Sequence, residues 1–131
     1  MIFDMDRYIK ETAMELYPRL YIGKSVNNPD KLLHKLEKPS KFMRFYVIVK
    51  SKNPFDQLEI YKACYLSQKY FKNNPIYVIG IASNYEEAVD IIRQIATECY
   101  QYSGNCNLKD YLFCEDTLKR NPCTTEKLNE G

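Results

Sequence analysis

Tryptophan is absent from this sequence, histidine occurs once, and glycine is scarce at four residues in 131. No stretch has the glycine-rich spacing that holds the phosphates of a dinucleotide or a nucleoside triphosphate. The single histidine, His34, excludes a multi-histidine metal site and is interpreted as a surface residue. The sequence therefore gives no reason to expect the enzymes that depend on such sites, and we predict no catalytic residue and no cofactor.

Long apolar runs are also missing. No stretch of 18 apolar residues exists, which excludes a predicted membrane-spanning helix and a membrane partner. Residues 1–6 are acidic and lack the apolar core of a secretory signal, so we expect a cytoplasmic protein. In that compartment the five cysteines are expected to be reduced thiols.

Close cysteine pairs, the usual mark of a structural zinc site, are absent as well. Cys99, Cys106, Cys114 and Cys123 are separated by six, seven and eight residues. This spacing does not place pairs of thiolates on knuckle turns, so no metal site is predicted.

What the chain has in abundance is tyrosine, with twelve residues, beside a 45% hydrophobic content that is ordinary for a globular protein. A chain of this length buries about two-thirds of the surface that its unfolded form exposes, which is enough for one core. We predict a single globular α/β domain over residues 1–114. Residues 115–131 are polar and are predicted to form a flexible C-terminal tail.

Two segments have the composition of strands. Residues 43–50 contain a run of aromatic and β-branched side chains, which suits a pleated surface. Residues 76–82 are almost continuously apolar, which is typical of a strand that is covered on both faces. Two shorter segments allow two interpretations each: residues 20–23 suit a strand or a turn, and residues 108–114 suit a short helix or an edge strand.

Helical periodicity predicts four helices. The clearest covers residues 83–102, with Ser83 and Glu86 at capping-box spacing and Gly104 just beyond its end. The other three are predicted over 4–17, 30–37 and about 54–71. For the last of these, the tyrosine content also supports an extended hairpin near residues 62–63.

The resulting order is strand, helix, strand, helix. We therefore predict an α/β fold with a β-α-β-α core, an N-terminal helix and parallel neighbouring strands joined by a right-handed crossover. The alternative is an α+β fold in which the two strong strands are antiparallel or separated.

Two short patterns suggest chemistry. Gly80–Asn84 lies where ligands bind in open α/β sheets, but Glu86 and Glu87 place negative charge at that position, which favours a capped helix start. Tyr65 and Lys69 have the Tyr-x-x-x-Lys spacing that resembles short-chain dehydrogenases. The chain is about half the length that those enzymes need and lacks their glycine-rich turn, so chance helical spacing explains the pattern.

Charge is distributed unevenly. Residues 30–52 carry seven cations and two anions, a net charge of +5, while the whole chain carries +2. The segment also holds the aromatic residue Phe42, a combination that suits phosphate contacts and stacking. An acidic face is expected on the 83–102 helix. The candidate partner-binding residues are Lys35, Lys38, Lys41 and Arg44 on the basic segment, and Glu87, Asp90 and Glu98 on the acidic face.

Because the chain supplies surfaces and no catalytic set, we predict a non-enzymatic protein-interaction or regulatory module whose partner is another protein. Phage and mobile-element accessory proteins, anti-CRISPR inhibitors among them, are similar in kind, since they are short, lysine-rich and free of motifs. The first alternative is a nucleic-acid-binding module that uses residues 31–52. The second is a small enzyme with a site at the C-terminal end of the 76–82 strand.

Overall fold

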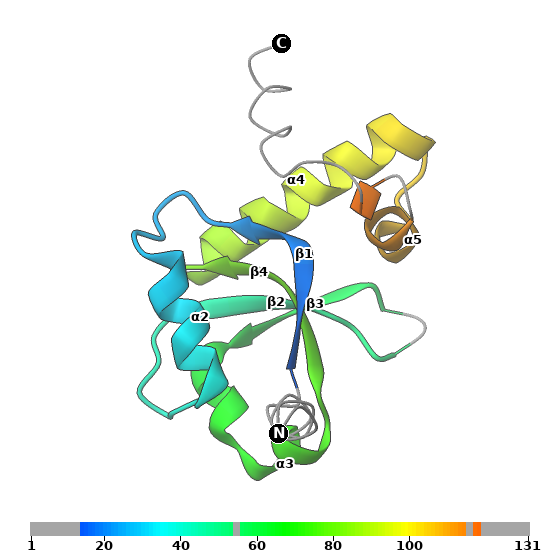
Figure 1. The fold of residues 1–131 in the computed structure, drawn as a ribbon. Helices are drawn as coiled ribbons and strands as arrows, with labels where there is room; N and C mark the ends of the chain where they lie inside the picture. The colour runs from blue at the N-terminus through cyan, green and yellow to red at the C-terminus, as the bar shows by residue number, and fades with distance from the viewer. Residues whose placement is uncertain (1–13, 54–55, 115–116, 119–131) are drawn as a thin grey trace, which may run out of the picture.

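A computed structural model describes residues 14–53, 56–114 and 117–118, and every structural statement below concerns these residues. They form one small domain around a mixed four-stranded sheet (Figure 1). The strands are β1 (Met14–Ile22), β2 (Tyr46–Lys50), β3 (Leu58–Lys62) and β4 (Ile76–Ala82). Their order across the sheet is β1-β4-β2-β3, so β1 and β3 form its two edges.

The helices lie in two layers, one on each face of the sheet (Figure 1). One layer consists of α4 (Tyr85–Ser103) and α5 (Leu108–Phe113). The other consists of α2 (Pro29–Glu37), the 3-10 helix η1 (Ala63–Ser67) and the short helix α3 (Lys69–Asn73). Each layer encloses its own cluster of buried side chains against the sheet, which explains why the central strand β4 is apolar almost throughout.

The pairing of the strands differs from the predicted β-α-β-α core. β4 runs parallel to β1, but β2 runs antiparallel to both β4 and β3. The two strong strands are therefore antiparallel neighbours, as in the α+β alternative. The physical reason is that the chain after β2 returns at once as the hairpin partner β3 instead of crossing the sheet as a helix.

The helix predicted over residues 54–71 is wrong for residues 58–62, which form β3. Residues 63–67 form η1 and residues 69–71 belong to α3, while residues 54–55 lie outside the described residues. Leu58 and Ile60 pack against the α4 side of the sheet, while Tyr61 packs against the α2 side, which is the two-residue alternation of a strand. Gln57 fixes the start of this strand, since its Nε2 donates to the Cys106 carbonyl oxygen at 2.8 Å and its Oε1 accepts from the backbone N–H of Leu108.

The helix predicted over residues 4–17 is wrong for residues 14–17, which belong to β1, and its remainder lies outside the described residues. Pro18 was expected to end a helix, yet it lies inside a strand. Because β1 is an edge strand with a register shift between Leu16 and Tyr21, a residue without an N–H is tolerated there.

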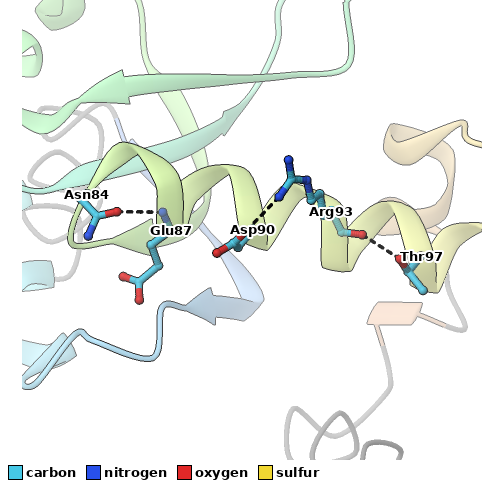
Figure 2. A network of polar contacts seen from close by, with 5 residues as sticks. All are labelled: Asn84, Glu87, Asp90, Arg93 and Thr97. Atoms are coloured by element: carbon cyan, nitrogen blue, oxygen red, sulfur yellow. Dashed lines mark hydrogen bonds and ion pairs between the residues drawn. The ribbon is translucent and has the colours of Figure 1, made fainter.

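The helices predicted over residues 83–102 and 30–37 and the strand over 76–82 are confirmed. The N-cap of α4 is Asn84, one residue later than predicted, and its side chain accepts a hydrogen bond from the Glu87 N–H at 2.8 Å (Figure 2). Gly104 ends α4 with a φ of 74°, a left-handed conformation that glycine adopts without strain.

The buried side chains of the strands and helices divide between the two clusters. Ile48, Ile79 and Ile95 are buried on the α4 side of the sheet, whereas Val47 and Val78 are buried on the α2 side. Of the predicted tail, Thr117 is buried and Leu118 packs against the α4-side cluster, while 115–116 and 119–131 lie outside the described residues. Within the described ranges, no helix is both long enough and apolar enough to cross a membrane.

Candidate functional site

The carboxyl ends of β1 and β4 lie side by side at the point where the sequence suggested a ligand site. The Gly23 N–H donates to the Ile81 carbonyl oxygen at 2.8 Å and joins the two strand ends. The Glu87 carboxylate then accepts three hydrogen bonds of 2.8 Å, from the Ser83 N–H and from the N–H and hydroxyl of Ser25. The donors that would bind an anion here are therefore already bound to a carboxylate of the chain itself.

The electrostatics of Glu87 agree with this geometry. Burial raises the pKa of its carboxyl, but the hydrogen bonds from Ser83 and Ser25 outweigh burial, and the pKa lies below its ordinary value of 4.5. A Cβ atom at Gly23 would overlap the Glu87 carboxylate, so a larger residue at this position would displace the carboxylate from its hydrogen bonds. The arrangement joins the turn after β1 to the first turn of α4.

Glu98, a second residue of the predicted acidic face, is also engaged inside the domain. Its carboxylate accepts from the hydroxyls of Tyr21 at 2.7 Å and Tyr111 at 3.1 Å. Burial and the neighbouring carboxylate raise the pKa of Tyr21, so the phenol stays protonated. Glu98 thus connects β1, α4 and α5 in the structure.

Asp90 is the third predicted acidic residue, and it lies on the exposed surface of α4. It forms an ion pair with Arg93 one helical turn away, at 3.2 Å, and Thr97 donates to the Arg93 carbonyl oxygen at 2.9 Å (Figure 2). Of the three carboxylates predicted to bind a partner, one therefore faces solvent, and it already has a cationic neighbour.

The basic segment is arranged in the opposite way. Lys35, Lys38, Lys41 and Arg44 are all exposed, while the side chains that hold the segment to the sheet point inward. These anchors are Leu36, Met43 and Phe45. Phe42 lies between the cations and is 77% exposed, with the Lys41 Nζ 5.5 Å from the centre of its ring.

We call Lys35, Lys38, Lys41, Phe42 and Arg44 the basic surface. Among the described residues, no carboxylate lies within ion-pair distance of its four cations. The charged contacts found among the described residues lie elsewhere: Arg93 pairs with Asp90, and His34 lies 3.8 Å from Glu37, an ion pair only when the imidazole is protonated. The basic surface thus consists of four solvated cations and an exposed aromatic ring, which lies beside Lys41.

The remaining predicted patterns are not brought together as sites. Tyr65 lies in η1 and Lys69 begins α3, so the pair does not span one turn of a single helix. His34 is exposed on α2. The described cysteines form no disulfide with one another, Cys99 is buried, and within the described ranges no group of three metal-ligating side chains lies close enough to hold an ion. Cys123 lies outside the described residues.

Sequence reasoning missed one polar cluster, on the β2–β3 hairpin near the loop that joins the two strands. A cavity of about 140 Å³ lies there between the hairpin and α3. On its wall the Tyr61 hydroxyl donates to Glu59 at 2.5 Å, and the Ser51 hydroxyl donates to the other oxygen of Glu59 at 3.2 Å. Burial and Glu59 raise the pKa of Tyr61 to about 12. The alternation of residues 58–62 is the signal that would have placed Glu59 and Tyr61 on one face.

No protein-family model matches the chain, and neither a curated protein nor a solved structure is significantly similar to it.

Proposed function

We propose that this chain is a non-enzymatic protein-interaction module that binds an acidic region of a partner protein on its basic surface. The observation that carries the proposal is the exposure, within residues 35–44, of four cations without a described carboxylate partner together with the exposed ring of Phe42. An aromatic ring supplies contact area, and flexible cations steer an acidic partner toward it. A module of this kind acts by occupying its partner, which is how a regulatory or inhibitory protein works.

The acidic face of α4 is the weaker candidate for the same role. Glu87 and Glu98 accept hydrogen bonds from within the domain, so a partner would have to compete with groups that are already in place. The lysines of the basic surface have no such internal partners among the described residues, and binding would cost only their hydration and side-chain freedom.

A nucleic-acid-binding module is the second candidate, because lysines around an exposed aromatic ring also suit phosphates and bases. The charge of the molecule favours a protein partner. The sequence pI of about 8.2 lies below the value of about 9 that is typical of nucleic-acid-binding domains. The four cations also include a single arginine, the residue that binds phosphate with two hydrogen bonds.

A small enzyme with its site at the carboxyl end of β4 is supported less than either. The Glu87 carboxylate occupies the donors at that end, and the charged residues that line a cavity of about 260 Å³ beside it are Glu87, Asp90 and Lys24. Two carboxylates against one ammonium do not suit a phosphorylated substrate.

The proposal is tested by partner recovery with the purified chain as bait in lysate of the native host, at two salt concentrations and with and without nuclease. The test variant carries Lys35→Glu, Lys38→Glu and Lys41→Glu. The matched control carries the same change of charge at three exposed lysines outside the basic surface, Lys24→Glu, Lys52→Glu and Lys69→Glu. Circular dichroism verifies that both variants are folded.

We expect wild type and control to recover the same partner protein and the test variant to lose it. Recovery by wild type should persist after nuclease treatment and should decrease at the higher salt concentration. Equal recovery by all three chains would contradict the proposal. Recovery that nuclease abolishes would replace it with the nucleic-acid alternative.

A further inference from the structure

The two edge strands of the sheet present very different outer edges. β1 contains Pro18 and a register shift between Leu16 and Tyr21, so its outer edge is irregular. β3 pairs with β2 without interruption from Leu58 to Lys62. A regular, unpaired strand edge is a template for the addition of another strand.

The hydrogen bonds between β2 and β3 determine which backbone groups of β3 point away from the sheet. The Ser51 N–H donates to the Gln57 carbonyl oxygen, and the Ala63 N–H donates to that of Phe45, so residues 57 and 63 point their hydrogen bonds toward β2. Because such pairs alternate along an antiparallel ladder, residues 59 and 61 point the same way. The N–H groups of residues 58, 60 and 62 therefore point outward, away from the sheet.

Side chains beside this edge also suit a contact. The rings of Tyr61 and Phe71 lie 5.5 Å apart, and Phe71 lies 4.9 Å from Tyr70, which is 59% exposed. In the described part of the chain, no strand pairs with the outer side of β3. Three rings in contact therefore extend from β3 to solvent, namely Tyr61, Phe71 and Tyr70. They lie beside the outward-pointing backbone groups of β3, which pair with no strand of the described chain.

We propose that β3 pairs antiparallel with β3 of a second copy of this chain, about a twofold axis through Ile60, and that the dimer contains one continuous eight-stranded sheet. The two Ile60 residues exchange N–H and carbonyl hydrogen bonds. Each Lys62 N–H donates to the Leu58 carbonyl oxygen of the other copy. The Lys62 carbonyl oxygen is engaged at the start of η1, of which Lys62 is the N-cap, so it takes no part in the pairing between the two copies. The proposal is independent of the basic surface and of its partner.

The charges of β3 select this register. With the axis at Ile60, each Glu59 faces the Tyr61 of the other copy, and the one hydroxyl hydrogen of Tyr61 can be donated to either of the two Glu59 carboxylates. Lys62 faces Leu58, and its aliphatic stem can cover that side chain. An axis one residue earlier would place two Glu59 side chains directly opposite each other, which is unfavourable.

The structure suggests a substitution that blocks this pairing without disturbing the fold. Lys62 has a φ of −66° and a ψ of 132°, its side chain is exposed, and its N–H points outward. Proline adopts this φ without strain and removes only the outward N–H. Lys62→Pro therefore deletes two of the four main-chain bonds of the dimer, while Lys62→Ala removes the same charge and keeps the N–H.

The experiment is sedimentation velocity on wild type, Lys62→Pro and Lys62→Ala at concentrations up to about 1 mM, where even an association with a Kd near that value is visible. A short edge contact is small, so we expect reversible, concentration-dependent dimers of the wild type and of Lys62→Ala. Lys62→Pro should stay monomeric with an unchanged circular dichroism spectrum. A monomeric wild type over the whole range, or a Lys62→Pro variant that dimerises like wild type, would overturn the proposal.

Amide hydrogen exchange at two concentrations locates the contact. The N–H groups of Ile60 and Lys62 should exchange fast in dilute wild type and at least tenfold more slowly at high concentration. The N–H groups of Glu59 and Tyr61, which lie inside the ladder, are the internal control and should be protected at both. Dimers in which residues 60 and 62 gain no protection would place the contact elsewhere and contradict the β3 pairing.

Discussion

The two layers that cover the sheet contain the same kinds of charged side chain and use them in opposite ways. On the α4 side, Glu87 and Glu98 accept hydrogen bonds from β1, from the turn that follows it and from α5. On the α2 side, the lysines and Arg44 of the basic surface point to solvent. Charge along a sequence therefore does not reveal whether the charge holds the fold together or remains available to a partner.

The difference comes from how each helix packs. α4 is 19 residues long and packs against β4, β2 and α5, and its Glu98 reaches hydroxyls of β1 and α5. α2 has nine residues, of which Leu36 is buried and Leu32 and Leu33 are partly buried. Its charged side chains lie on the other side of this short helix, in water. The comparison predicts that substitutions in the α4 layer lower the stability of the fold, while those on the basic surface leave it nearly unchanged.

The largest effect is expected at the centre of the α4 layer. Ile95 is fully buried, and Ile95→Ala should lower the free energy of unfolding by about 2–5 kcal/mol because it leaves a cavity. Urea unfolding followed by circular dichroism measures this, with Lys38→Ala as the control on the other layer. An unchanged midpoint for Ile95→Ala would contradict the packing of α4.

A smaller loss is expected at Glu98. Glu98→Ala removes the acceptor of the Tyr21 hydroxyl, and a buried polar group without its partner costs about 1–3 kcal/mol. Asp90→Ala on the same helix removes only an exposed ion pair, which is worth at most about 0.5 kcal/mol. If thermal unfolding showed the same loss of stability for Glu98→Ala and Asp90→Ala, Glu98 would belong to the solvated face of α4.

The third test uses pH. Because the pKa of Glu87 is lower in the folded chain than its ordinary value of 4.5, its contribution to stability is complete above pH 4.5 and is lost as the pH falls through the folded pKa. Wild type should therefore lose stability below about pH 4.5 more steeply than Glu87→Gln, which cannot titrate. Parallel curves of melting temperature against pH for the two chains would remove Glu87 from this role.

The smallest effect on stability is expected on the basic surface. Lys35→Glu, Lys38→Glu and Lys41→Glu should each change the free energy of unfolding by no more than about 0.5 kcal/mol, because the side chains are exposed and have no described ion-pair partner. Denaturant unfolding of each single variant measures this. A loss as large as that of Glu98→Ala would mean that these lysines support the fold and are not available for docking.

Elements with strong local signals could be predicted from the sequence. β4 is a continuous apolar run, and α4 has a long helical period that ends at a glycine with positive φ. α2 begins at Asn28, whose side chain accepts from the Lys31 N–H, followed by a proline in the first turn. In each case the residues that decide the structure lie within a few positions of one another.

The edge strands could not be predicted, because distant residues decide them. Residues 14–17 are compatible with a helix until β4 offers a parallel partner 62 positions along the chain. β3 depends on the bonds from Gln57 to residues 106 and 108, which no local pattern contains. Both segments follow the tertiary contact instead of the local preference.

The two candidate surfaces also differ in how well the sequence predicts them. The basic surface could be predicted from the spacing of its lysines, because Lys35, Lys38 and Lys41 need only be exposed. The roles of Glu87 and Glu98 depend on Ser25 and Tyr21, which lie 62 and 77 positions away in the sequence. A sequence shows which residues are charged, but not which distant groups share their hydrogen bonds.

The pairing of β1 with β4 also has a consequence for synthesis of the chain. Residue 22 leaves the ribosome 60 residues before residue 82, so at about 5–20 residues per second β1 waits roughly 3–12 s for its partner. The β2–β3 hairpin closes locally within microseconds of its emergence. During that interval β1 has no strand to pair with. Pro18 lies within β1 and has no N–H, so the unpaired strand is a poor template for other nascent chains. Pro18 therefore opposes aggregation during the stage of synthesis at which β1 is exposed.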